Sequence, residues 1–279
     1  MINMKKTIGI IGFGNMGSAI AQRIKKDYEV WVFDKKDIKQ TTSMFRINVA
    51  KSILEAAERS NGCVILAVKP QDVDSVLEEI SSTKINSLIS IAAGISISYI
   101  KKRLGGANVV RIMPNLPIKV GKGTICIAED SLSPEDRLLF AVGSLDSLGR
   151  IFYIRENMMD AATAVAGSGP GFFFALVEGI PRKDWEQFAR EVFALSLGNA
   201  ALAVGFDTEI AQELAMETAI GSLTLLQQSA LSPEALRMQV TSKGGTTEAG
   251  LEALEGKIEN LTKAVRAALR RAEELSKKE

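Results

Sequence analysis

The sequence begins with a short apolar run that leads into three glycines with the spacing G-x-G-x-x-G. Residues 8–11 are apolar, Gly12, Gly14 and Gly17 follow, and the next apolar residues recur at helical spacing. A strand, a tight turn and a helix N-terminus in this order form the context in which such a loop binds a dinucleotide. We therefore expect dinucleotide contacts from Gly12, Phe13, Gly14, Asn15, Met16 and Gly17.

The second strand pattern ends in an acid that bears on the choice of coenzyme. Asp34 lies about 20 residues after Gly12, where an acid commonly binds the adenosine ribose. An acid there favours the free 2′-hydroxyl of NAD, whereas the following Lys35 and Lys36 are cations suited to the 2′-phosphate of NADP. An ordinary solvated turn explains the two lysines equally well. The sequence leaves NADH and NADPH both open.

The first half of the chain, residues 1–156, alternates apolar strand patterns with helical ones. This alternation predicts a Rossmann-type, doubly wound parallel sheet, with a helix that opens at Ser133 and Pro134 before the last strand at residues 151–154. Ligands of such sheets sit beyond the carboxyl ends of the strands. The residues expected at that edge, in addition to the glycine loop and Asp34, are Lys35, Val68, Lys69, Pro70, Ala93, Gly94 and Asn115.

The second half, residues 157–279, contains no strand pattern and is rich in Ala, Leu, Glu and Gln at helical spacing. It predicts an all-helical domain, and small apolar residues on several helix faces predict burial against another chain. Two glycine-rich loops are expected, at residues 166–171 and 240–247. The second combines hydroxyls, backbone N–H groups and a helix N-terminus, which together suit a carboxylate.

Composition narrows the function further. The 279 residues predict two domains, and a formal charge of +1 provides no field for nucleic acid or an acidic membrane. The two cysteines suit a reducing cytosol, no apolar run is long enough to span a bilayer, and we expect a cytoplasmic protein. The sequence has no histidine, which removes the commonest general base and metal ligand, and we expect no metal.

Six motifs in order resemble the pyrroline-5-carboxylate reductase family, and the resemblance covers nearly the whole chain. They are residues 10–17, Ala-Val-Lys-Pro at 67–70, Ile-Ala-Ala-Gly at 91–94, Arg-Ile-Met-Pro-Asn at 111–115, Gly-Ser-Gly-Pro at 167–170 and Val-Thr-Ser-x-Gly-Gly-Thr-Thr at 240–247. The resemblance implies NAD(P)H-dependent reduction of 1-pyrroline-5-carboxylate, a cyclic imino acid, to L-proline, the last step of proline biosynthesis. It also implies a homodimer that assembles into a larger homo-oligomer.

The resemblance also implies residue roles. The carboxylate of the substrate would be held by Ser242, Gly244, Gly245, Thr246 and Thr247, and Thr247 would be the catalytic residue that hydrogen-bonds the ring nitrogen. Val68, Lys69, Pro70, Ala93, Gly94 and Asn115 would line the nicotinamide and ribose side. Hydride transfer to an imine needs orientation and electrostatic stabilisation more than acid–base catalysis, which agrees with the missing histidines.

The chain departs from the family pattern at several positions. Lys243 replaces the usual proline of the second loop, Met238 the usual acid before it, and Leu116 the usual threonine after Met-Pro-Asn. Pro181 interrupts a helix that runs on unbroken in the family, and residues 180–196 form an atypical insertion. We expect a lengthened helical hairpin or an altered oligomer there; one continuous helix across residues 179–204 would contradict this.

Two other functions are compatible with parts of the sequence. A hydroxyacid-dehydrogenase-type oxidoreductase shares the domain plan but needs a helical Lys-x-x-x-Asn pair, and Lys257 and Asn260 have the wrong spacing. A non-catalytic nucleotide-binding regulatory protein would explain Lys243 and the insertion. The intact Gly-Gly-Thr-Thr segment argues against this third function.

Overall fold

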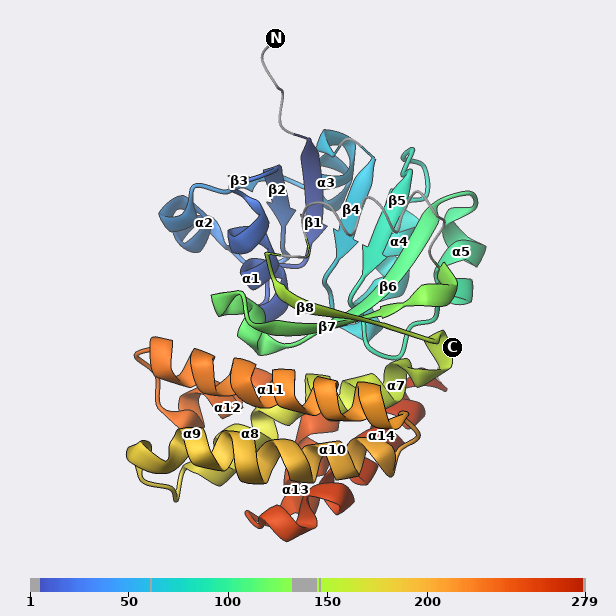
Figure 1. Ribbon diagram of the computed structural model, residues 1–279. Helices are drawn as coiled ribbons and strands as arrows, with labels where there is room; N and C mark the ends of the chain where they lie inside the picture. The colour runs from blue at the N-terminus through green and yellow to red at the C-terminus, as the bar shows by residue number, and fades with distance from the viewer. Residues whose placement is uncertain (1–5, 61, 132–144, 146, 278–279) are drawn as a thin grey trace.

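The computed structural model describes residues 6–60, 62–131, 145 and 147–277. In Figure 1 the sheet of the N-terminal half lies above the helices of the C-terminal half. The sheet has eight strands in the order β3-β2-β1-β4-β5-β6-β7-β8. Their bounds are β1 Thr7–Ile11, β2 Glu29–Phe33, β3 Asn48–Val49, β4 Cys63–Leu66, β5 Ser87–Ser90, β6 Asn108–Pro114, β7 Gly123–Ala128 and β8 Gly149–Ile154.

The predicted doubly wound parallel sheet is confirmed from β3 to β6, and one strand pair beyond it is antiparallel. Strand β7 runs antiparallel to β6, and β8 is again parallel to β7. A parallel pair needs a crossover of a dozen or more residues, and the connection at residues 115–122 is shorter and holds only the 3₁₀ turn η2, Leu116–Val120. The chain therefore reverses directly after β6.

Both faces of the sheet are covered, as the continuous apolar strand patterns predict. Ile10 of β1 packs in one apolar cluster with Ile20 of helix α1, whereas the next residue, Ile11, packs in the other cluster with Leu77 of helix α4. Besides η2, the helices and turns described in this half are α1 Asn15–Ile24, α2 Lys39–Phe45, α3 Ile53–Arg59, η1 Pro70–Asp72, α4 Val73–Ile80, α5 Ile97–Leu104 and η3 Glu129–Ser131. The helix predicted to open at Ser133 lies outside the described residues.

A single helix, Glu156–Val177, leads from the sheet into the helical half. It consists of η4 Glu156–Met158, α7 Met159–Ala162, the π-helical turn η5 Thr163–Gly167, and α8 Gly169–Val177. The helix has the length and hydropathy of a membrane span, and 78% of its most apolar window is buried within the protein, as in the core helix of a globular fold.

The expected loop at residues 166–171 is thus helical, which corrects the sequence prediction. Pro170 has no N–H to donate to the carbonyl of Ala166, four residues earlier. The wider π turn accommodates this, because the N–H of Ser168 bonds the carbonyl of Thr163 at 2.9 Å, five residues back. Asn115 Nδ2 then donates to the freed Ala166 carbonyl at 3.1 Å.

The predicted helix break at Pro181 is confirmed. Helix α8 ends at Val177, the chain turns, and a new helical segment follows Pro181, so no continuous helix crosses residues 179–204. The new segment packs Phe188 and Phe193 around Phe173 of α8. The elements after Pro181 are η6 Arg182–Asp184, α9 Trp185–Gln187, the π-helical η7 Phe188–Phe193, α10 Ala194–Leu202, α11 Thr208–Gln228, α12 Pro233–Val240, α13 Thr246–Leu254, η8 Ile258–Asn260 and α14 Leu261–Ser276.

Candidate active site

Each of the three glycines of the first loop is required, or permitted, for a different structural reason. Gly12 has a φ of +100°, and a Cβ there would lie 2.5 Å from the carbonyl oxygen of Ala67. A Cβ on Gly17 would collide with the Gly12 carbonyl oxygen and so separate α1 from β1. A Cβ on Gly14 would meet no atom within 4 Å, because it would project into open space in front of the loop. In dinucleotide-binding loops of this kind, a pyrophosphate approaches the backbone through such a space.

The N-terminus of α1 faces this space without a side-chain cap. Gly14 is the N-cap residue and supplies no side-chain hydrogen bond, so the N–H groups at Asn15, Met16 and Gly17 begin the helix uncapped. Such a terminus binds anions through its N–H groups and the helix dipole. The open approach at Gly14 and the uncapped helix together fit the phosphates of a dinucleotide.

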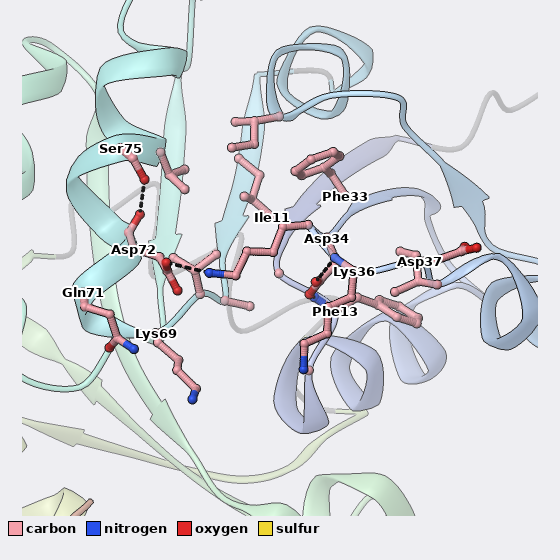
Figure 2. A pocket seen from close by; sticks show the side chains of 18 residues that line it. Ile11, Phe13, Phe33, Asp34, Lys36, Asp37, Lys69, Gln71, Asp72 and Ser75 are labelled. Atoms are coloured by element: carbon pink, nitrogen blue, oxygen red, sulfur yellow. Dashed lines mark hydrogen bonds and ion pairs between the residues drawn. The ribbon is translucent and has the colours of Figure 1, made fainter. Parts of the chain in front are cut away.

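A cavity of about 460 Å³ opens between the glycine loop, the end of β2 and the start of α4 (Figure 2). The structure brings seven of the predicted coenzyme residues to its wall: Gly12, Phe13, Gly14, Asp34, Lys35, Val68 and Lys69. The other seven, which are not among its lining residues, are Asn15, Met16, Gly17, Pro70, Ala93, Gly94 and Asn115. Their roles as coenzyme contacts stay predictions.

Both carboxylate oxygens of Asp34 accept backbone hydrogen bonds. Its Oδ2 accepts the N–H of Phe13 at 2.7 Å, and its Oδ1 accepts the N–H of Lys36 at 2.9 Å. The carboxylate therefore holds the glycine loop against the end of β2. A carboxylate has about four acceptor positions, so two remain for a ribose hydroxyl.

Lys35 is joined to a residue that the sequence analysis did not single out. Its Nζ donates to Asp72 Oδ1 at 2.8 Å, across the cavity from the segment after β2 to the end of η1. Figure 2 labels Asp72 and draws this contact as a dashed line. The hydrogen bond to Asp72, and then the charge of Asp72, raise the pKa of Lys35 above its usual value. Asp72, Gln71 and Ser75 line the cavity as well. The only sequence signal for them is that they follow Pro70, at the carboxyl end of a strand.

Two predicted coenzyme residues have structural partners elsewhere. Asn115 is buried, and besides its bond to Ala166 its Oδ1 accepts the N–H of Thr124 at 2.8 Å. Gly94 has a φ of +76°, and a Cβ there would come within 3.2 Å of Ser276 at the end of α14. Asn115 thus joins the β6–β7 reversal to the long helix, and Gly94 lets α14 approach the sheet edge.

The second loop, residues 241–245, precedes α13. Gly244 has a φ of +70° and donates its N–H to Glu248 Oε2 at 2.6 Å, whereas Gly245 donates to the Ser242 carbonyl at 2.9 Å. Two of the N–H groups expected to hold a carboxylate are therefore already paired. One of them binds the carboxylate of Glu248, and the first-turn N–H groups of α13 have no helical carbonyl before them.

Three hydroxyls meet where this loop packs on the long helix. Thr247 is 4% exposed and donates from Oγ1 to Ser168 Oγ at 3.1 Å. Ser168 Oγ also lies 3.1 Å from Thr246 Oγ1. Gly171 makes room for Thr247, because a Cβ there would lie 2.5 Å from Thr247 Cγ2. The Gly-Ser-Gly-Pro and Gly-Gly-Thr-Thr motifs are thus in contact.

Gln239, at the end of α12, connects the two loops within one chain. Its carbonyl oxygen accepts Asn15 Nδ2 at 2.8 Å, and its Oε1 accepts Lys119 Nζ at 2.6 Å. Burial lowers the pKa of Lys119 below its usual value. The loop that begins at Thr241 therefore starts beside the N-terminus of α1, where the phosphates are expected.

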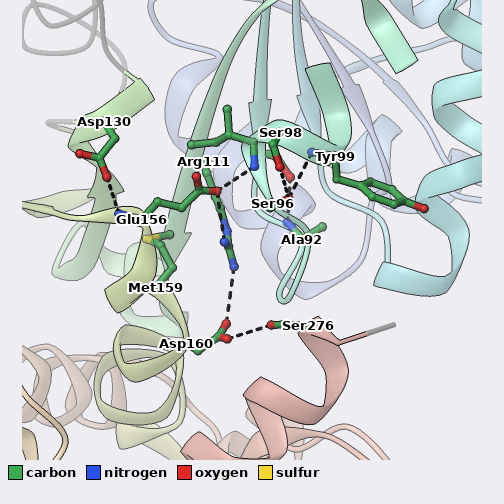
Figure 3. A network of polar contacts seen from close by, with 12 residues as sticks. Ala92, Ser96, Ser98, Tyr99, Arg111, Asp130, Glu156, Met159, Asp160 and Ser276 are labelled. Atoms are coloured by element: carbon green, nitrogen blue, oxygen red, sulfur yellow. Dashed lines mark hydrogen bonds and ion pairs between the residues drawn. The ribbon is translucent and has the colours of Figure 1, made fainter. Parts of the chain in front are cut away.

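A buried ion-pair cluster joins the sheet to the helical half (Figure 3). Arg111 Nη1 of β6 lies 3.4 Å from Glu156 Oε1, and its Nη2 lies 3.6 Å from Asp160 Oδ1. Glu156 Oε1 also accepts the N–H of Ile97 at 2.7 Å, and Asp160 Oδ2 accepts Ser276 Oγ at 2.9 Å. The cluster fixes the start of the long helix against the sheet edge. Within the described ranges, no group of three or more Cys, Asp or Glu is placed to hold a metal ion.

The fold and the site define an oxidoreductase with a dinucleotide-binding sheet domain and a helical second domain. A family model described as pyrroline-5-carboxylate reductase dimerisation matches residues 191–276, and one described as NADP oxidoreductase coenzyme F420-dependent matches residues 7–94. The chain is 35% identical over 287 aligned positions to the pyrroline-5-carboxylate reductase of Synechocystis sp., with 99% of this chain and 100% of that protein covered. The chain belongs to the pyrroline-5-carboxylate reductase family.

Two further relatives agree. The pyrroline-5-carboxylate reductase of Aquifex aeolicus is 35% identical, with 90% of this chain and 89% of that protein covered. The crystal structure of the Plasmodium falciparum pyrroline carboxylate reductase with NADP bound superimposes with a TM-score of 0.60 at 28% identity, and 99% of each chain is covered.

Proposed function

We propose that this protein reduces 1-pyrroline-5-carboxylate to L-proline with NADH or NADPH, as the last step of proline biosynthesis. Its full-length relatives carry the name of this activity. The contact between Asn15 and Gln239 is the structural observation that carries the proposal. It sets the start of the substrate loop beside the helix that faces the coenzyme phosphates, so one site serves both ligands.

The chain's own residues orient the substrate. When bound, the nicotinamide coenzyme supplies a hydride to the imine carbon. Thr247 uses its own proton in the bond to Ser168, so the lone pairs of its oxygen are left to accept. An acceptor suits the N–H of a protonated imine, whose positive charge makes the carbon electrophilic. The first-turn N–H groups of α13 and the loop hydroxyls of Ser242 and Thr246 suit the carboxylate.

The direct test is the oxidation of NADH and of NADPH by the purified protein with 1-pyrroline-5-carboxylate. We expect turnover with at least one coenzyme, and none with either in folded protein would refute the proposal. Thr247→Val keeps the shape of the side chain and removes the acceptor. We expect kcat to fall about 100-fold, as for a lost transition-state hydrogen bond, with the Kd of the coenzyme within about twofold of wild type.

A matched control is available in α11. The hydroxyl of Thr224 donates within its own helix, to the Ile220 carbonyl, 2.7 Å away. Thr224→Val makes the same chemical change at a residue of neither loop, and we expect its kcat to equal that of wild type. Equal rates for the Thr247→Val and Thr224→Val variants would remove Thr247 from the mechanism.

We further propose that the protein is a cytoplasmic homodimer that assembles into a larger homo-oligomer, with no nucleic-acid or membrane partner. Val192, Leu195 and Leu202 are exposed apolar side chains within the segment matched by the dimerisation family. A second copy of the chain would cover them. Light scattering after size-exclusion chromatography tests this, and a monomer at micromolar concentration would contradict it.

A further inference from the structure

The coenzyme cavity carries positive charge that is already neutralised. Three lysines line it, Lys35, Lys36 and Lys69, together with Asp34, Asp37 and Asp72. The formal charges cancel. The 2′-phosphate that distinguishes NADPH from NADH would add about 1.5 to 2 negative charges to this wall. Binding of NADPH would therefore favour an excess of cationic side chains, and the residues that line this cavity have no such excess.

Asp34 is held where the ribose 2′-position is expected. Because both of its oxygens accept backbone N–H groups, the carboxylate stays in place when a ligand approaches. Its remaining acceptor positions suit a 2′-hydroxyl, which is a donor. A 2′-phosphate at the same position is negatively charged, and it would be repelled by the Asp34 carboxylate at close range.

Lys35 is the cation that follows this acid, and it is directed elsewhere. Its ammonium is paired with Asp72, whose side chain is 30% exposed, at the far wall of the cavity. To reach a 2′-phosphate beside Asp34, Lys35 must leave Asp72 and expose that carboxylate. Asp72 therefore competes with the phosphate for the same ammonium group.

We propose that Asp72 is a specificity-determining residue, which by holding Lys35 acts with Asp34 to make this protein prefer NADH to NADPH. The inference rests on the proposed function only for the identity of the coenzyme. Asp72 is a positioning residue, since it acts on the coenzyme through Lys35.

The structure sets the size of the effect. The Lys35 side chain is 72% exposed, and an exposed ion pair is worth up to about a fivefold change in an equilibrium. Asp72→Asn removes the charge and keeps the shape. We expect it to tighten NADPH binding about two- to fivefold and to change NADH binding by less than about twofold.

The experiment is calorimetric titration of the whole protein with NADH and with NADPH, in the absence of substrate and at low salt. Wild type is expected to bind NADH at least about tenfold more tightly than NADPH. Asp74→Asn is the matched control: Asp74 carries the same charge on the neighbouring helix α4, pairs with Arg103 and Tyr99, and lies outside the cavity lining. It should leave the ratio of the two dissociation constants unchanged.

Each outcome decides. Tighter binding of NADPH than of NADH by wild type overturns the proposal, as does an unchanged ratio in Asp72→Asn. If the ratio of the two dissociation constants changes equally in Asp74→Asn, the effect comes from net charge alone, and the proposal is overturned as well. Asp72→Asn leaves both hydrogen bonds from the backbone to Asp34 intact and removes only an exposed ion pair, so we expect the variant to fold. The titration needs no turnover, and a protein that prefers NADH yet fails to reduce 1-pyrroline-5-carboxylate refutes the proposed function alone.

Discussion

Gly14 and Gly17 belong to one motif, yet the structure predicts opposite consequences for adding a methyl group to each. At Gly14 the new Cβ meets no protein atom within 4 Å, and a φ of −71° is open to alanine. At Gly17 it collides with the backbone of Gly12 and lies 3.2 Å from Ala67 Cβ. Gly14→Ala therefore perturbs only a ligand, whereas Gly17→Ala perturbs the fold.

The magnitudes follow from these contacts. Overpacking at Gly17 costs about 1–3 kcal/mol, offset by about 1 kcal/mol because alanine is the better helix former. We expect Gly17→Ala to lower the free energy of unfolding by up to about 2 kcal/mol and Gly14→Ala to change it by less than about 0.5 kcal/mol. At Gly14 the methyl group takes the position from which phosphate oxygens reach the helix N–H groups. Loss of one charged hydrogen bond there costs about 2 kcal/mol, roughly a thirtyfold rise in the coenzyme Kd.

Urea unfolding and calorimetric titration with NADH measure the two quantities separately. The expected pattern is weak binding with normal stability in Gly14→Ala, and lowered stability in Gly17→Ala. Binding by Gly14→Ala within twofold of wild type would show that no phosphate approaches this backbone. A stability loss in Gly14→Ala equal to that in Gly17→Ala would mean that the space in front of the loop is not open.

Three further predictions concern other parts of the chain. Arg111→Met leaves two carboxylates without their cation and should lower the free energy of unfolding by about 3 kcal/mol in urea titration; a loss below about 1 kcal/mol would contradict this. Burial raises the pKa of Cys63 to about 11 and that of Cys126 to about 12, so both stay protonated at pH 8. Mass spectrometry should find neither alkylated by iodoacetamide in native protein; rapid labelling of Cys126 would refute its burial, and rapid labelling of Cys63 would refute its raised pKa. Glu248→Gln replaces the carboxylate that accepts the Gly244 N–H by a neutral amide, which is a weaker acceptor. It should lower the KM for 1-pyrroline-5-carboxylate about fivefold, with an unchanged or higher KM as the opposing result.

The sequence predicted the first half of the fold well because its signals are local. Apolar runs buried on both faces specify parallel strands, and the glycine spacing specifies the turn and helix after β1. The reversal at β7 was missed, since strand direction depends on the length of a connection and not on the strand residues. A helix ended before Pro181 as predicted, because proline has no N–H to continue the helix and its ring clashes with the preceding turn.

Residues 166–171 were misread for the opposite reason. Two hydrogen bonds compensate for the N–H that Pro170 lacks. The N–H of Ser168 bonds within the π turn, and the carbonyl of Ala166 accepts from Asn115, which is far away in the sequence. Neither is visible in a local pattern of glycine, serine and proline. The Lys35–Asp72 pair was missed in the same way, because charges 37 residues apart meet only after the sheet has formed.

The long helix Glu156–Val177 has a mechanical consequence. It is clamped by Arg111 at its first turn and carries Ser168, the partner of Thr247, about 18 Å further along its axis. A tilt of about 5° at the clamped end displaces Ser168 by about 1.5 Å. Displacements of about 1 Å are enough to cost a hundredfold in rate. The ion-pair cluster therefore helps to fix the position of the Ser168 hydroxyl, although about 18 Å of helix separates the two.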